Sequence, residues 1–179
     1  MPTDWYVKGS SGLIRATAPL IPGLATAGTS SRFLVTAGGG NAIPDGSGEE
    51  PVVWDGVDSD YNDLGLTIRG NGYTVEIAEN GEYLMTLFIE VGAVSGGGFT
   101  IRGTINTVNS DPNDVIAPRS TSHALVGDGY NPSVSVASVA KFLGGDTLYA
   151  GVEQNGAAFS ISVVYASLTI TKLRSITGF

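Results

Sequence analysis

Residues 73–91, which read YTVEIAENGEYLMTLFIEV, decide the fold class of this chain. Two runs with strand-like alternation meet at Asn80-Gly81, a pair that supplies the backbone freedom of tight turns. The odd positions of the second run are all apolar, which predicts that this side of the strand faces a core. They are Tyr83, Met85, Leu87, Ile89 and Val91.

The opposite side of the same strand is also rich in apolar side chains. Its positions are Leu84, Thr86, Phe88 and Glu90, where a solvated sheet should carry polar residues throughout. We therefore expect this second face to be covered. Three covers are open at this point: the amino-terminal arm, a loop, or another copy of the chain.

Apolar residues recur with a period of two in several further runs from about residue 50 onward, separated by Asn-Gly or Gly-rich links. Six or more short strands with almost no helical periodicity predict an all-β sandwich or barrel. One run, SVASVAKFL at 135–143, also fits a short helix. In the last run the apolar positions are odd up to Tyr165 and even from Leu168. This phase change predicts a bulge or bend near Ala166.

Residues 1–46 differ from the rest, because Gly, Ala, Ser and Thr dominate and only Phe33 to Val35 suggest a strand. Such a segment has too little apolar surface for a core of its own. It is either a flexible leader or an attachment arm that orders on a partner, and we expect the arm. The folded domain is then predicted to span 47–179. Candidate anchors of the arm are Trp5, Tyr6, Leu13 and Ile14, with Leu20-Ile21.

Composition excludes several classes of function. The chain has 179 residues, a net charge of −8 and no cysteine. The acidic charge speaks against binding nucleic acid or anionic lipid, and the lack of cysteine excludes disulfides and thiolate zinc sites. No run of the sequence reaches the ~18–20 apolar residues of a membrane span, and the first twenty residues do not have the pattern of a signal peptide.

Two motifs resemble those of the complement globular-head and tumour-necrosis-factor jelly rolls. The first is Gly81-Glu82-Tyr83-Leu84-Met85-Thr86-Leu87, preceded at the expected spacing by Val57, Asp63, Ile68 and Val75. The second is VSVASVAKFLGGDTLYAGV, in which Gly145-Asp146 matches a Gly-Asp pair before a core strand. The resemblance covers about residues 50–173. No collagen-like repeat precedes it in this sequence.

The resemblance implies an antiparallel jelly-roll β-sandwich that forms a homotrimer. The residues that would face the three-fold axis are Leu84, Thr86 and Phe88, with Tyr149 as a further candidate. On this reading, another copy of the chain is the cover of the second face of the strand at 83–91.

The fold is similar to that of trimeric structural proteins of bacterial viruses, such as head-decoration proteins, head fibres and tail-fibre tips. We therefore expect a non-enzymatic virion protein that attaches through residues 1–46 to a major capsid protein or another virion protein. The alternative is a tail-fibre or receptor-binding module that adheres to a host-surface glycan, with Tyr130 as a stacking residue. Both expectations rest on analogy between folds.

The sequence favours no catalytic site, cofactor or metal. His123 is the only histidine, and no G-x-S-x-G motif accompanies it. Asp55, Asp58, Asp60 and Asp63 offer oxygen ligands for calcium, but the glycine and glutamate of an EF-hand loop are missing. Solvated turn carboxylates are the simpler interpretation. Nothing singles out a carboxylate pair for glycoside hydrolysis.

Overall fold

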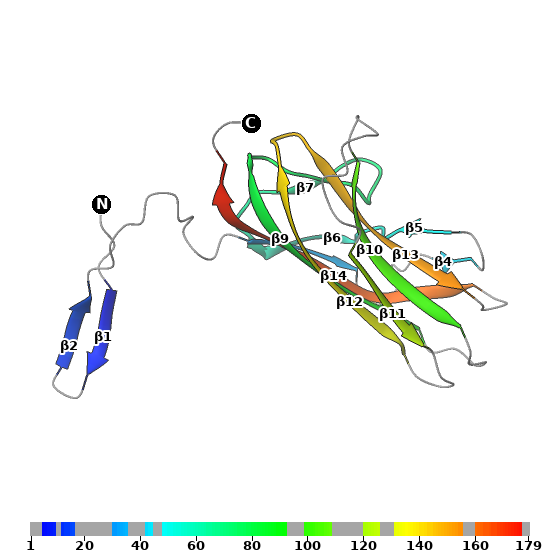
Figure 1. The fold of residues 1–179 in the computed structure, drawn as a ribbon, viewed down its shortest axis with the longest axis horizontal. Helices are drawn as coiled ribbons and strands as arrows, with labels where there is room; N and C mark the ends of the chain where they lie inside the picture. Colours follow the sequence, from blue (N-terminus) through cyan, green and yellow to red (C-terminus); the bar gives the residue numbers. More distant parts are fainter. Residues whose placement is uncertain are drawn as a thin grey trace.

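The computed structural model describes residues 5–9, 12–16, 30–35, 42–44, 48–92, 99–108, 120–125, 131–155 and 160–176. Within these residues the chain is all-β, as predicted, and it has no helix. Two six-stranded sheets, whose strands pair antiparallel, form the two layers of the body (Figure 1). A separate two-stranded sheet joins β1 (Trp5–Gly9) and β2 (Gly12–Ala16).

The first layer, named here the β13 sheet, has the strand order β11-β10-β13-β8-β7, with β5 also on β13. Its strands are β5 (Glu50–Pro51), β7 (Thr67–Ile68), β8 (Val75–Glu76), β10 (Thr100–Val108), β11 (Ser120–Leu125) and β13 (Thr147–Asn155).

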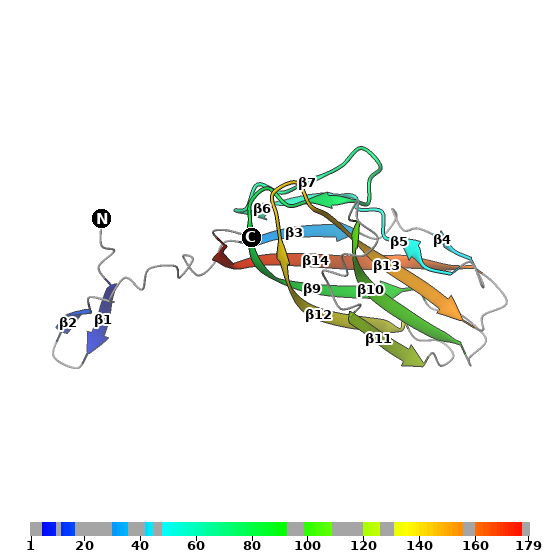
Figure 2. The same cartoon turned by 45° about the horizontal axis from the view of Figure 1, so that its top comes forward.

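The second layer, named here the β9 sheet, has the order β12-β9-β14-β3-β6, with β4 also on β14. Its strands are β3 (Ser30–Val35), β4 (Ala42–Ile43), β6 (Gly56–Asn62), β9 (Gly81–Val91), β12 (Ser133–Phe142) and β14 (Ile161–Ser175). Figure 2 shows β3, β14, β9 and β12 lying side by side.

The core lies between the two sheets and is filled by one face of each long strand. In β9 all the odd positions from 81 to 91 are buried, as the alternation predicts. They meet side chains such as Phe99, Ile101, Leu148 and Val152 of the opposite layer in one apolar cluster. The run at 135–143 is a strand, because positions 134, 136, 138, 140 and 142 are buried and those between them are exposed.

The phase change predicted near Ala166 is a β-bulge in β14. Val163 pairs with Val91 and Tyr165 with Glu90, so Val164 is an extra residue. After the bulge Ala166, Leu168 and Ile170 are buried. Tyr165 lies beyond the bulge and is 37% exposed, so the prediction that it faces the core is wrong.

The two runs of the stretch at 73–91 do not form a hairpin. β8 pairs with β7 and β13 in one layer, whereas β9 pairs with β12 and β14 in the other. The Asn80-Gly81 link therefore passes between layers. Gly81 begins β9 between two neighbouring strands, where a Cβ would lie 2.9 Å from the Tyr83 ring and 3.0 Å from the Arg174 carbonyl oxygen. Close approach, rather than turn geometry, explains a glycine here.

At the end of the β9 sheet where Gly81 lies, two polar contacts with Glu79 cover the core. The Tyr83 hydroxyl donates to the Glu79 carbonyl oxygen at 2.7 Å, and the Lys172 Nζ donates to the Glu79 carboxylate at 2.5 Å. Burial raises the pKa of Tyr83 to about 12, with a smaller contribution from the charge of Glu79. The Lys172 ammonium lowers the pKa of Glu79. Lys172 thus caps the core with its aliphatic stem while its charge reaches an exposed partner.

The domain boundary expected at residues 46/47 is wrong, because the sheet begins earlier. β3 pairs with β14 over residues 30–35, and β4 pairs with β14 at Ala42 and Ile43. Phe33 and Ile43 are both 0% exposed within the core. Residues 30–43 therefore include two strands of the jelly roll. The segment that precedes the body is 1–29.

Candidate self-association surface

The outer face of the β9 sheet carries the apolar side chains that the sequence predicted for β9. Leu84 and Phe88 are half-buried there, and Thr86 is exposed. β12 adds Val139, which is 47% exposed, and β14 adds Tyr165. Exposed apolar side chains gathered on one face in this way are typical of interaction surfaces.

Strand pairing arranges this face in rows that run across the sheet. One row is Val139, Leu84, Thr171 and Ser30; the next is Ala137, Thr86, Thr169 and Arg32; the third is Ser135, Phe88, Ser167 and Leu34. Most neighbours of Leu84 and Phe88 in these rows are small or carry a hydroxyl group. Such neighbours leave the two large side chains prominent.

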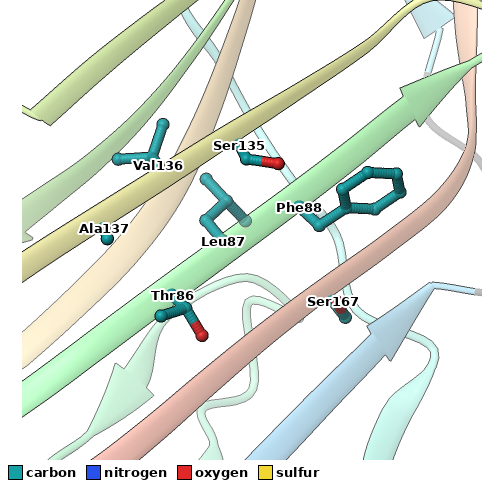
Figure 3. A pocket seen from close by; sticks show the side chains of 7 residues that line it. All are labelled: Thr86, Leu87, Phe88, Ser135, Val136, Ala137 and Ser167. Carbon is teal, nitrogen blue, oxygen red and sulfur yellow. The ribbon is translucent and has the colours of Figure 1, made fainter.

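A shallow hollow of about 290 Å³ surrounds Phe88 (Figure 3). It is lined by Thr86, Leu87, Phe88, Ser135, Val136, Ala137 and Ser167. The rings of Phe88 and Tyr165 contact each other, with centroids 5.9 Å apart and planes tilted by 57°. An aromatic pair beside a hollow lined with small side chains can receive an apolar group and exclude water from it.

An ordered ionic cluster lies at the β6 side of the same face. The Arg32 Nε donates to the Asp58 carboxylate at 3.0 Å, and the guanidinium carbon lies 4.1 Å from the centre of the Tyr61 ring. The hydrogen bonds from Arg32 lower the pKa of Asp58, and the same contact raises that of Arg32. Arg32 is therefore held in one place beside an exposed tyrosine.

Of the four residues predicted to face a three-fold axis, the structure brings three together. Leu84, Thr86 and Phe88 share the outer face of the β9 sheet. Tyr149 is wrong as a fourth member, because it lies on β13 in the other sheet and packs edge-on to Tyr73 at 6.3 Å. Sequence reasoning missed Val139, although its place between the buried positions of a strand would have identified it.

The predicted arm anchors belong to β1 and β2, which pair with each other as a hairpin. In this pairing Trp5 stands opposite Ala16, Tyr6 opposite Arg15, Leu13 opposite Lys8 and Ile14 opposite Val7. Leu20 and Ile21 lie outside the described residues.

The described residues bring together no cluster of metal ligands. No group of three or more His, Asp or Glu side chains that could hold a metal occurs in the described residues, and Asp58 is engaged by Arg32. His123 stands opposite Arg102 in the pairing of β11 with β10. Tyr130 lies outside the described residues. Within the described ranges, no helix has the length and hydropathy needed to cross a bilayer.

Comparison with solved structures finds the same architecture in many chains, including the following three. An Eiger TNF from S. frugiperda superposes with a TM-score of 0.56 and 17% identity, covering 85% of this chain and 96% of that one. The globular domain of a zebrafish complement 1qA protein gives 0.56 and 13%, covering 83% and 99%. Murine APRIL at pH 5.0 gives 0.52 and 16%, covering 80% and 99%.

No protein-family model matches the sequence, and no curated protein matches it. At these identities the comparison establishes the fold alone. The chain therefore has the antiparallel jelly roll seen in TNF-like proteins and complement globular heads, as the sequence predicted.

Proposed function

We propose that the protein is a non-enzymatic structural protein that assembles as a homotrimer through the outer face of the β9 sheet. The observation that carries the proposal is the exposed aromatic and aliphatic cluster around Phe88 on that face. Interfaces commonly place aromatic anchors near the centre of the contact, surrounded by residues that contribute little energy but exclude water. The fold shared with TNF-like and complement proteins supports a three-fold arrangement.

Our proposal continues with a role in a virus particle, as a capsid decoration or head-fibre protein. Residues 1–29 would attach the trimer to a capsid or other virion protein, and the jelly roll would be displayed outside. The hairpin supports attachment in two ways. It pairs with neither six-stranded sheet, and an isolated two-stranded hairpin is marginally stable in water. A partner that packs against it would stabilise it.

Light scattering on the purified full-length chain tests the assembly. We expect a mass near three times 18.4 kDa. Phe88→Asp should give a folded monomer, because a charge would be desolvated at the centre of the contact, at a cost of about 2 kcal/mol or more. Val53→Asp is the matched control, since Val53 is 39% exposed but lies outside the β9 face; this variant should remain a trimer.

Two results would contradict the proposal. A monomeric wild-type chain would remove the trimer altogether. A Phe88→Asp variant that remains trimeric would show that the contact uses another surface. Attachment is tested separately, by cosedimentation of the full-length chain with virus particles that lack it. Glycan binding without cosedimentation would favour an adhesion module instead.

A further inference from the structure

The two side edges of the candidate self-association surface carry opposite charge. At one edge β12 contains a single charged residue, Lys141, and its side chain is exposed. At the other edge β6 and the turn after it contain Asp58, Asp60 and Asp63 and no cation. This asymmetry bears on which edges can meet when copies of the chain associate.

Three of these charges have no ionic partner within the part of the chain that the structure describes. The carboxylate of Asp58 is held by Arg32. In contrast, the side chains of Lys141, Asp60 and Asp63 form no ion pair or hydrogen bond among the described residues, and all three are exposed. Each is therefore available to a group outside its own chain.

The strand pairing places Lys141 and Asp63 at similar heights on the sheet. Lys141 pairs with Glu82. The Asp63 backbone N–H bonds to the Ser30 carbonyl oxygen at 2.9 Å, and Ser30 lies in the row of Leu84, the row next to Glu82. Adjacent rows on one face are two residues apart, about 7 Å. The long side chain of a lysine can bridge most of that offset.

Symmetry then decides which edges come together. In a closed cyclic ring every contact is heterologous, so one edge of a copy meets the opposite edge of the next, whereas a two-fold dimer places like edges together. We propose that Lys141 of one copy pairs with Asp63 of its neighbour, so that opposite edges of the β9 sheet join and the ring closes. This inference rests on the proposed trimer and adds the charge pair that orients it.

Charge reversal with rescue tests the pair. Lys141→Glu and Asp63→Lys should each weaken the full-length assembly, because each creates three like-charge contacts per ring. We expect the protein concentration at which the assembly dissociates to rise by about tenfold at low ionic strength. The double variant Lys141→Glu/Asp63→Lys should dissociate at nearly the wild-type concentration. Light scattering over a dilution series measures all three, and the single-variant effects should shrink at high salt.

A second double variant controls for net charge. Lys141→Glu/Glu50→Lys has the same net charge, but Glu50 lies on β5 in the other sheet, so it should not restore assembly. Rescue within one chain is also excluded. Positions 141 and 63 lie at opposite edges of the sheet, four strand spacings or about 19 Å apart, so Asp63→Lys cannot relieve repulsion between Lys141→Glu and the neighbouring Glu82.

The outcomes separate this inference from the proposed trimer. The pair is supported if the wild-type chain is a trimer and if Asp63→Lys, but not Glu50→Lys, restores the assembly of the Lys141→Glu variant. A wild-type trimer in which neither reversal weakens assembly, or in which Glu50→Lys rescues equally well, overturns the pair and leaves the trimer standing. A wild-type chain that is monomeric overturns both.

Discussion

At the scale of single residues, Gly81 stands at a position at the edge of the core where a side chain would meet close neighbours. A Cβ there would lie within 3.0 Å of the Tyr83 ring, the Arg174 carbonyl oxygen and the Lys172 stem. We expect Gly81→Ala to destabilise the fold by about 1–3 kcal/mol, because the backbone of β14 cannot move away without breaking pairing. Urea denaturation followed by circular dichroism measures the change.

Gly56→Ala is the control for this prediction. No atom lies within 4 Å of a Cβ built on Gly56, and its φ angle is not in the left-handed region. Its stability should change by less than about 0.5 kcal/mol. Equal losses for the two variants would mean that close packing at Gly81 is not the reason for the glycine.

Single residues also show how well the alternation of apolar and polar residues in the sequence predicts which side chains share a surface. It was sufficient for Leu84, Thr86 and Phe88, because one uninterrupted strand carries all three. It was wrong for Tyr149, since alternation gives the two faces of a strand but not the sheet to which the strand belongs. It was also wrong for Tyr165, because the extra residue lies two positions before Ala166.

At the scale of elements, the bulge in β14 keeps both ends of this strand in register with the core. Deleting Val164 should move Ile161 and Val163 from the buried to the exposed face, because a shift of one residue inverts the faces of a strand. We expect a loss of about 3–5 kcal/mol for two displaced side chains. Denaturation midpoints of the deletion and of Val164→Ala test this.

Val164→Ala keeps the chain length and should cost about 1.5 kcal/mol or less, since Val164 is only partly buried. If the deletion is as mild as this substitution, the strand has an alternative register that buries as much apolar surface.

Strands were predicted well where apolar residues alternate with others over many positions, and poorly where the strands are short. β12 was ambiguous because Val and Ala satisfy both periods, and pairing with β9 decides for a strand. The Asn80-Gly81 link looked like a hairpin turn, yet it passes between layers, because β8 has two residues and finds its partners in the other sheet. Local sequence does not encode such distant pairing.

At the scale of the whole molecule, the corrected boundary makes two truncations behave differently. Removing residues 1–29 should leave a folded trimer that no longer attaches to its partner. Removing 1–46 also deletes Phe33 and Ile43, both fully buried, together with β3 and β4. Each lost side chain costs about 1.5–3 kcal/mol, so the two together remove about 3–6 kcal/mol of a typical stability of about 5–15 kcal/mol. The truncation also deletes two strands that pair with β14, so we expect this chain to unfold.

Circular dichroism and light scattering distinguish the two truncated chains. A folded 47–179 chain would show that β3 and β4 are dispensable additions to the sheet. An unfolded 30–179 chain would show that the hairpin segment stabilises the body. The boundary was misplaced because β3 and β4 are short and stand among Gly- and Ala-rich residues, whose composition hides two strands.

The place of β14 has a consequence for biosynthesis. β14 lies between β9 and β3, so the first strand of the body waits for Ile161–Ser175 to be synthesised before it gains its main partner. At ~5–20 residues per second this interval is on the order of ten seconds. During that time Phe33 and the edges of β9 are open to other nascent chains. Slower translation should therefore lower the soluble yield, and a chaperone that holds the first half of the chain should raise it.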